Sequence, residues 1–130
     1  MKRRTDQGFS LLEVMVSLSI IAIALMAIVS TVLHTIRMKE SEKEQQIAKQ
    51  AVTRKVEELK AGTFSTLFAT YDGTTFGVAD LVHTAGPTGQ GLGTVEIDNT
   101  NSELLDITVT VQWNGILGDG TYSLRTLQTR

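Results

Sequence analysis

Three residues near the N-terminus have types and a spacing that could support chemistry together. Gly8 and Phe9 lie between a basic leader, MKRRTDQG, and a long apolar run, and Glu13 is the acid at the front of that run. A carboxylate inside a membrane helix is costly, about 2.5–3.5 kcal/mol for a charged residue at mid-helix, so a partner is expected. The basic flank is one candidate partner. Cleavage between Gly8 and Phe9 would supply a better one, because it frees an α-amine one helical turn before Glu13.

The other residues with catalytic or metal-binding side chains form no recognisable constellation. The two histidines, His34 and His83, are far apart, and the absence of cysteine excludes thiolate metal sites. Four aspartates are scattered without a calcium-loop pattern: Asp72, Asp80, Asp98 and Asp106. No nucleophile lies at a suggestive spacing from a base. We therefore predict no metal site, no cofactor and no enzymatic activity.

Neither the glycine-rich stretch nor the net charge of the chain indicates binding of nucleotides or nucleic acids. The stretch GPTGQGLG (86–93) is rich in glycine, but it lacks the Lys and the following helix of a phosphate-binding loop. Its Gly and Pro content predicts a flexible loop instead. The net charge of −2 gives no reason to expect nucleic-acid binding.

The apolar run must position Glu13, and its length fits a membrane. Val14 to Ile36 contains no Asp, Glu, Lys or Arg over 23 residues, and about 20 apolar residues cross a bilayer as a helix. Ser17, Ser19, Ser30 and Thr31 interrupt the run only lightly, because hydroxyls can bond back to the helix backbone. The basic flank Lys2–Arg4 predicts a cytoplasmic N-terminus, which places the chain after about Arg37 across the membrane.

Three simpler interpretations of this run compete. A buried core helix rarely stays apolar for so long. A cleaved secretory signal peptide has a shorter apolar region followed by a small-x-small cleavage site, and no convincing site follows here. A plain signal anchor needs only the basic flank and the span, but it leaves Glu13 and the Gly8–Phe9 junction unexplained.

The helical pattern continues beyond the span. The chain has no Pro and no Gly between Arg37 and Ala61, and residues 39–46 are polar all round. An apolar stripe then recurs at helical spacing and consists of Ala48, Val52, Val56 and Leu59. We predict one helix from Phe9 to Ala61, with Gly62 as its C′ stop.

The remaining residues, 62–130, form a polar, Gly- and Thr-rich head with a strand-like end. Residues 63–91 read as irregular loop, with short strands around Phe64–Tyr71. Strands are predicted at Thr94–Ile97, in LLDITVTVQW and in TYSLRTLQT, the last two joined by the turn Asn114–Gly120. In LLDITVTVQW apolar and polar residues alternate, which places Ile107, Val109, Val111 and Trp113 on one face of the strand. The expected fold is α+β: a long N-terminal helix packed on a small antiparallel sheet of three or four strands. The apolar face of the sheet should lie on the Ala48–Leu59 stripe.

The stretch GFSLLEV, behind a short basic leader and ahead of an uninterrupted apolar helix, resembles the type IV prepilin signature. The resemblance implies that prepilin peptidase cuts after Gly8 and methylates the new amine of Phe9, and that Glu13 serves assembly. It further implies a leader at 1–8, a membrane and filament-core helix at 9–36, an amphipathic continuation at 37–61 and a head at 62–130. The chain would then be a substrate of the peptidase, and its fold would be pilin-like.

The resemblance also implies partners and a location. Before assembly the precursor would cross the inner membrane once, in contact with lipid, and afterwards it would join a periplasmic or surface filament. Its partners would be other pilin or pseudopilin subunits and the inner-membrane assembly platform.

The subtype rests on finer features. The apolar segment lacks the Pro that major pilins usually carry, and LLEV is closer to minor subunits. The end of the chain resembles PilV-type minor pilins. The alternatives are the small I-type minor pseudopilin of type II secretion and a signal-anchored periplasmic protein of other function.

Overall fold

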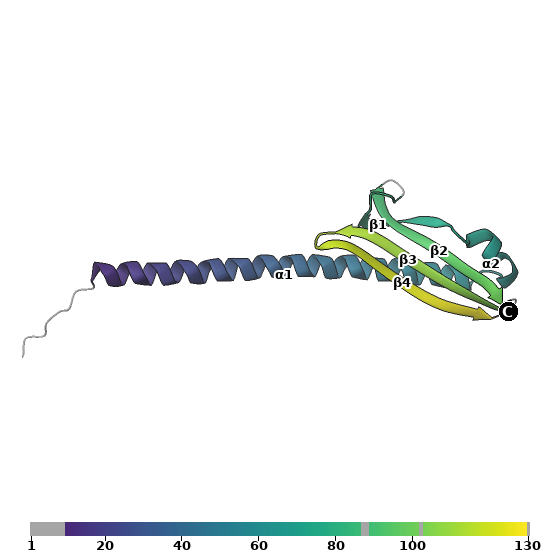
Figure 1. The fold of residues 1–130 in the computed structure, drawn as a ribbon, viewed down its shortest axis with the longest axis horizontal. Helices are drawn as coiled ribbons and strands as arrows, with labels where there is room; N and C mark the ends of the chain where they lie inside the picture. The colour runs from purple at the N-terminus through teal and green to yellow at the C-terminus, as the bar shows by residue number, and fades with distance from the viewer. Residues whose placement is uncertain (1–9, 87–88, 102, 130) are drawn as a thin grey trace, which may run out of the picture. The chain divides into compact units, whose positions relative to one another are not determined.

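The computed structural model describes residues 10–86, 89–101 and 103–129, and it contains two helices and four strands (Figure 1). The chain divides into two compact units between Ile36 and Arg37. The first helix, α1 (Leu11–Lys60), contributes to both units, which are described one at a time below. The part of the chain up to Ile36 is called unit 1, and the part from Arg37 is called unit 2.

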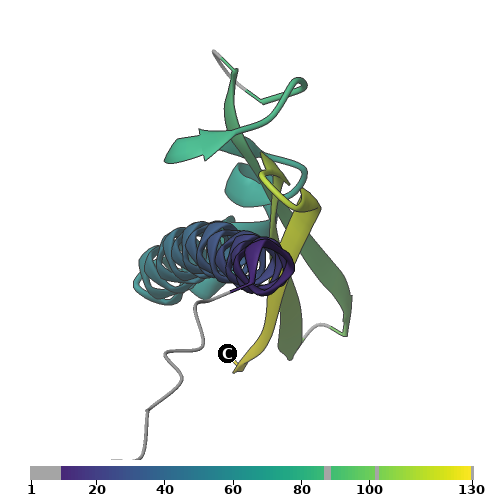
Figure 2. The same ribbon diagram turned by 90° about the vertical axis from the view of Figure 1, so that its left-hand side faces the viewer.

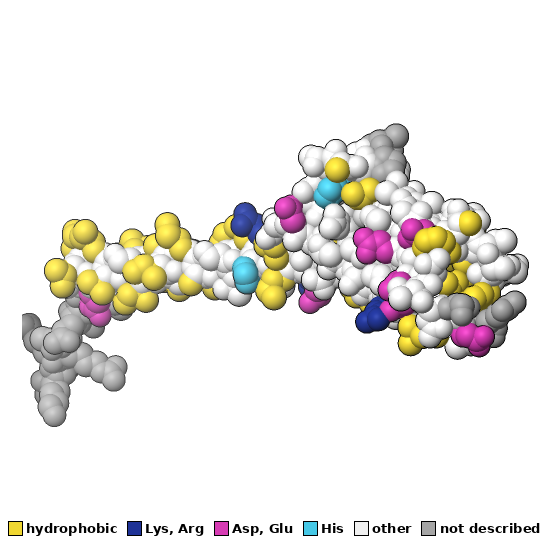
Figure 3. Space-filling view, turned by 45° about the vertical axis from the view of Figure 1, so that its right-hand side comes forward, with side chains coloured by type: hydrophobic (Ala, Val, Ile, Leu, Met, Phe, Trp, Pro, Cys, Tyr) yellow, Lys and Arg dark blue, Asp and Glu magenta, His cyan; other side chains and the backbone are white. Residues whose placement is uncertain are grey.

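Unit 1 consists, in its described part, of the apolar portion of α1. All of its described residues are exposed, including sixteen large hydrophobic side chains from Leu11 to Ile36. Hydrophobic side chains cover much of the visible face of this segment (Figure 3). A helix that is apolar all round is stable only when lipid or other protein covers it.

Unit 2 is the head, and its core forms between the second part of α1 and the sheet. The predicted stripe is buried as expected, with Ala48, Val52 and Leu59 at 0% exposure and Val56 at 5%. The strands lie on one side of this helical segment (Figure 2). The helix–sheet arrangement confirms the predicted α+β, pilin-like fold class.

The sheet is an antiparallel meander of four strands in the order β1-β2-β3-β4. Its strands are β1 (Thr75–Val82), β2 (Gln90–Asn101), β3 (Leu104–Gly115) and β4 (Gly118–Thr129). On β3 the alternation predicted from the sequence is confirmed, because the four predicted inward residues, Ile107, Val109, Val111 and Trp113, are all buried. Tyr122 and Leu124 of β4 are half-buried beside this core.

The prediction for residues 63–91 is wrong in part. Phe64–Tyr71 forms a helix, α2, where short strands were expected, and β1 occupies residues predicted as loop. The aromatic and Thr content favoured strands. However, Phe64, Leu67 and Tyr71 have helical spacing, and in a helix all three pack on the core, with Leu67 buried in it. Tyr71 also contacts α1, because Lys55 Nζ lies 5.3 Å from the centroid of its ring. Packing against the core therefore decided the conformation.

Two boundaries also differ from those predicted. β2 begins at Gln90, so it includes half of the glycine-rich stretch 86–93, which was predicted as a flexible loop. Residues 87–88 of that stretch lie outside the described residues. Helix α1 ends at Lys60, and Gly62 does not adopt the positive φ of a C′ glycine. Its role is close packing instead, because a Cβ there would lie 2.9 Å from Leu67 Cδ2.

Candidate processing and assembly segment

The predicted processing residues, Gly8 and Phe9, lie outside the described residues. The structure begins to describe the chain at Ser10, whose carbonyl oxygen accepts hydrogen bonds from the backbone N–H groups of Glu13 and Val14 at 2.9 and 3.2 Å. Glu13 therefore sits in the first turn of α1. A carboxylate is electrostatically favoured there, because the helix dipole presents partial positive charge at its N-terminus.

Four hydroxyl side chains within the apolar segment form hydrogen bonds to the backbone of their own helix. The hydroxyls of Ser17, Ser19 and Thr31 donate to the backbone carbonyl oxygens four residues earlier, at 2.7, 2.9 and 2.9 Å. Thr35 does the same at 2.9 Å. These groups need no water, so the segment can enter an apolar environment without unsatisfied hydroxyl donors at these four positions.

Length and composition make α1 the one helix in the described part of the chain that could cross a membrane. Its apolar portion follows Glu13 directly. The carboxylate therefore stands at the entrance to the apolar segment rather than at its centre, where the cost of a charge is highest.

Comparison with protein families found a match over this segment. Residues 3–32 match the prokaryotic N-terminal methylation motif. The matched range contains Gly8, Phe9 and Glu13 and supports a type IV prepilin-like family. Comparisons with curated proteins and with solved structures found no match. The motif implies a structural subunit that is processed by prepilin peptidase and assembles with other pilins. Together with the apolar helix, it is consistent with a membrane-anchored precursor.

The aspartates of the head have structural roles. The Asp72 carboxylate accepts a hydrogen bond from the backbone N–H of Ile97 at 2.9 Å, which ties the end of α2 to β2. Asp80 adopts a left-handed φ of 66° within the irregular part of β1. Asp98 accepts hydrogen bonds from the backbone N–H and hydroxyl of Thr100, and these bonds lower the pKa of its carboxyl.

Asp106 forms an ion pair with Arg125 across β3 and β4. Arg125 Nε lies 2.7 Å from both carboxylate oxygens of Asp106, and Nη2 also contacts Oδ2. The hydrogen bond from Arg125 holds the pKa of the Asp106 carboxyl below its usual range. Sequence reasoning missed this pair, because the two residues are 19 positions apart and only the strand register brings them together.

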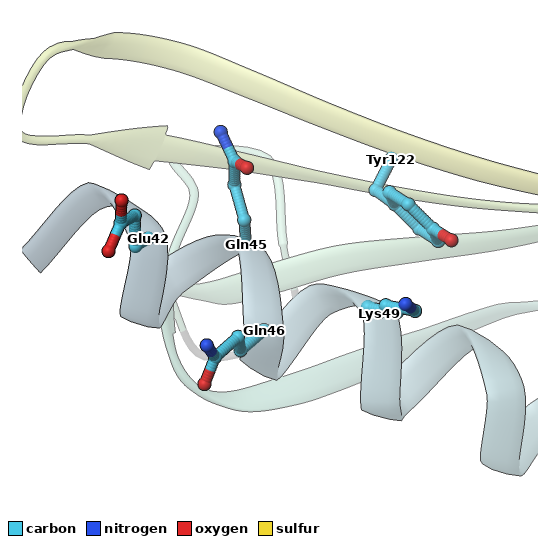
Figure 4. Close-up of a pocket in the computed structure, with 5 residues that line it drawn as sticks. All are labelled: Glu42, Gln45, Gln46, Lys49 and Tyr122. Carbon is cyan, nitrogen blue, oxygen red and sulfur yellow. The ribbon is translucent and has the colours of Figure 1, made fainter. Parts of the chain in front are cut away.

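The pocket between the helical segment of unit 2 and β4 offers no catalytic arrangement. It is shallow, with a volume of about 220 Å³, and is lined by Glu42, Gln45, Gln46, Lys49 and Tyr122 (Figure 4). This lining has one carboxylate and no histidine, so it lacks a nucleophile–base pair. Within the described ranges, no three residues among His, Asp and Glu gather closely enough to hold a metal ion.

Proposed function

We propose that the chain is the precursor of a minor pilin-like subunit of a type IV pilus. Prepilin peptidase removes residues 1–8 and methylates the amine of Phe9. Val14 to Ile36 spans the inner membrane before assembly and packs in the filament core afterwards. The observation that carries the proposal is the methylation motif at residues 3–32, which overlaps the first part of α1, where the large apolar side chains from Leu11 to Ile36 are all exposed.

Intact-mass analysis tests the proposal. The chain is produced with and without a prepilin peptidase and extracted from membranes. We expect the coexpressed sample to lack residues 1–8 and to carry one added methyl group on Phe9. A signal-anchored protein of other function would keep its N-terminus, and a secreted protein would be cut after the apolar segment instead.

The I-type minor pseudopilin of type II secretion is the alternative subunit. Its stem and processing would be the same, so the mass measurement does not separate the two. Coassembly does: the chain should be recovered with pilus subunits in one case and with the components of a secretion pseudopilus in the other.

Glu13 is proposed to act in assembly. When the helices leave lipid for a protein core, the Phe9 ammonium of a neighbouring subunit can neutralise the Glu13 carboxylate. Buried polar pairs are best attested as devices that fix register, so this pair would set the axial stagger between subunits. The alternative is neutralisation within one chain, one helical turn away.

Replacing Glu13 by Val is expected to leave membrane insertion and cleavage after Gly8 intact and to reduce incorporation into filaments strongly. Glu13→Asp, one methylene shorter, should be intermediate. The measurement is the fraction of subunit in sheared filaments relative to the processed fraction in membranes. Glu40→Val is the matched control, because it removes an exposed carboxylate of the same helix outside the apolar run. Wild-type incorporation of Glu13→Val would exclude a role for the carboxylate in assembly.

A further inference from the structure

A hollow of about 330 Å³ opens in the head between α2 and the adjoining ends of β2 and β3. Four apolar residues line it: Phe64, Phe68, Ala69 and Leu105. Phe68 is 37% exposed, whereas Leu105 is 4% exposed and belongs to the core. Concave sites that bind ligands or partner side chains are typically lined by aromatic and aliphatic residues with a few polar groups. We call this site the α2 hollow.

The rim of the α2 hollow is polar and acidic. Asn99 and Asn101 line it from the end of β2, and both are exposed. Their side-chain amides have N–H donors, which can bond to backbone carbonyl groups of an occupant. Asp98 and Glu103 flank the two asparagines in the chain, and residues 61–124 contain seven acidic residues and no Lys or Arg. The α2 hollow therefore suits an apolar occupant that has unpaired carbonyl groups and positive charge nearby.

The β3–β4 turn has two exposed aliphatic residues at its tip. Ile116 and Leu117 are 52% and 57% exposed, at positions where small or polar residues are usual. The turn does not need them for its conformation, because Gly115 and Gly118 pair across its base and Gly118 has a φ of +120°. The ladder between β3 and β4 does not include the backbone groups of the two tip residues. The tip is therefore free to serve a contact outside its own head.

The tip and the α2 hollow lie at opposite ends of the same strand (Figure 1). Leu105, in the hollow, is near the start of β3, and Gly115, at the base of the turn, is its last residue. Ten residues separate them, which is about 33 Å along a strand. A tip cannot reach the hollow of its own head, so only a second molecule can bring the two together.

Charges beside the tip complement the rim. Trp113 Nε1 donates to Glu44 Oε2 at 3.3 Å, which places the end of β3 beside the first turns of the helical segment of unit 2. Lys39 and Lys43 are exposed in those turns, where they alternate with glutamates. Long lysine side chains can pair with the acids at the rim, while exposed glutamates can remain hydrated.

We propose that the Ile116–Leu117 tip of one head docks in the α2 hollow of a second copy of this chain. The aliphatic side chains cover Phe68 and Leu105, and the carbonyl groups of the tip accept hydrogen bonds from the rim amides. Tip and hollow are different patches, so the contact is heterologous and can repeat from copy to copy. It goes beyond the proposed function and involves unit 2 alone.

The contact is expected to be weak between free heads. Two side chains in a hollow bury far less than the roughly 1,200–2,000 Å² of a stable interface. Binding strengthens when copies are held close together, because their effective concentration rises to the millimolar range. A filament holds its subunits in this way, so the docking would act there as one of several contacts between neighbours.

Residues 37–130 are suitable for testing the contact. The fourteen buried hydrophobic residues of the described chain, from Ala48 to Trp113, all belong to unit 2, and every described residue of unit 1 is exposed. Unit 2 therefore contains the whole described core, and this fragment folds without unit 1. The chain has no cysteine, so a single introduced cysteine marks one position.

Two versions of the fragment are mixed at millimolar concentration and joined with a short bismaleimide. Ile116→Cys marks the tip, and isotope-labelled Ser65→Cys marks the α2 hollow, which Ser65 also lines. We expect the mixed dimer, identified by its intact mass, to be severalfold more abundant than in a mixture of Ser123→Cys with labelled Ser65→Cys. Ser123 is the matched control, because it is exposed midway along β4.

Removal of the apolar tip tests what drives the contact. Adding Leu117→Ser to Ile116→Cys should reduce the mixed dimer to the control level. Adding Leu127→Ser to Ile116→Cys should leave the yield unchanged, although it also replaces a leucine that is 57% exposed.

Three results would overturn the docking. The first is a mixed dimer at the control level when the tip retains Leu117. The second is cross-linking of Ile116→Cys with itself as readily as with Ser65→Cys, which would mean that tip meets tip. The third is an unchanged yield with Leu117→Ser, which would show that the apolar tip is not the docking group. The intact-mass test of processing is independent of all three, so the docking and the proposed function can fail separately.

Discussion

Val52→Asp is expected to unfold the head while membrane insertion persists. Val52 is 0% exposed, on the stripe of α1 that packs against the sheet. Truncating the apolar contact removes about 1.5–3 kcal/mol of burial, and an unpaired carboxylate in this core costs several kcal/mol more. Domains of this size are stable by only about 5–15 kcal/mol in total, so we expect most of the stability of the head to be lost.

Limited proteolysis of membrane-bound protein measures this effect. Residues 62–130 should be degraded rapidly in Val52→Asp, whereas the span stays protected by lipid. Thr53→Asp is the matched control, since it places the same charge one residue later on the exposed face of the helix. Equal resistance of the two variants would show that the stripe does not support the head.

Gly8→Val is expected to abolish maturation. A protease that cuts at a membrane face needs close approach to the backbone, and a β-branched side chain beside the scissile bond would obstruct it. The variant should accumulate in membranes as a precursor that is eight residues too heavy and carries no methyl group on Phe9. The same intact-mass measurement applies, in the presence of prepilin peptidase.

The control for this variant is Gln7→Val, which places the same side chain at the second residue before the predicted cut. We expect it to be processed, because the residue beside the scissile bond remains glycine. Normal processing of Gly8→Val would mean that Gly8 is not recognised by the peptidase, and the proposed cleavage site would then be wrong.

The features that the sequence predicted correctly are those encoded by neighbouring residues. The period of 3.6 in Ala48, Val52, Val56 and Leu59 identified the buried face of α1, and the period of 2 in LLDITVTVQW identified the buried face of β3. The family match is equally local, since it covers residues 3–32. The roles of Gly8, Phe9 and Glu13 within that segment stay predictions.

Tertiary structure decided the features that depend on distant residues. Phe64–Tyr71 has the composition of a strand, and it is helical because its apolar positions meet the core on one face. The Asp72–Ile97 and Asp106–Arg125 contacts follow from strand pairing and connect positions 25 and 19 residues apart.

The Glu44–Trp113 hydrogen bond joins residues 69 positions apart, and it brings the aliphatic β3–β4 turn to the start of the helical segment of unit 2. Local periodicity specifies which face of each helix or strand is apolar, because it repeats over a few residues. It carries no information about which distant element meets that face or at what register. Packing and hydrogen bonding across the folded chain supply that information, which is why the place of Ile116 and Leu117 emerged only from the structure.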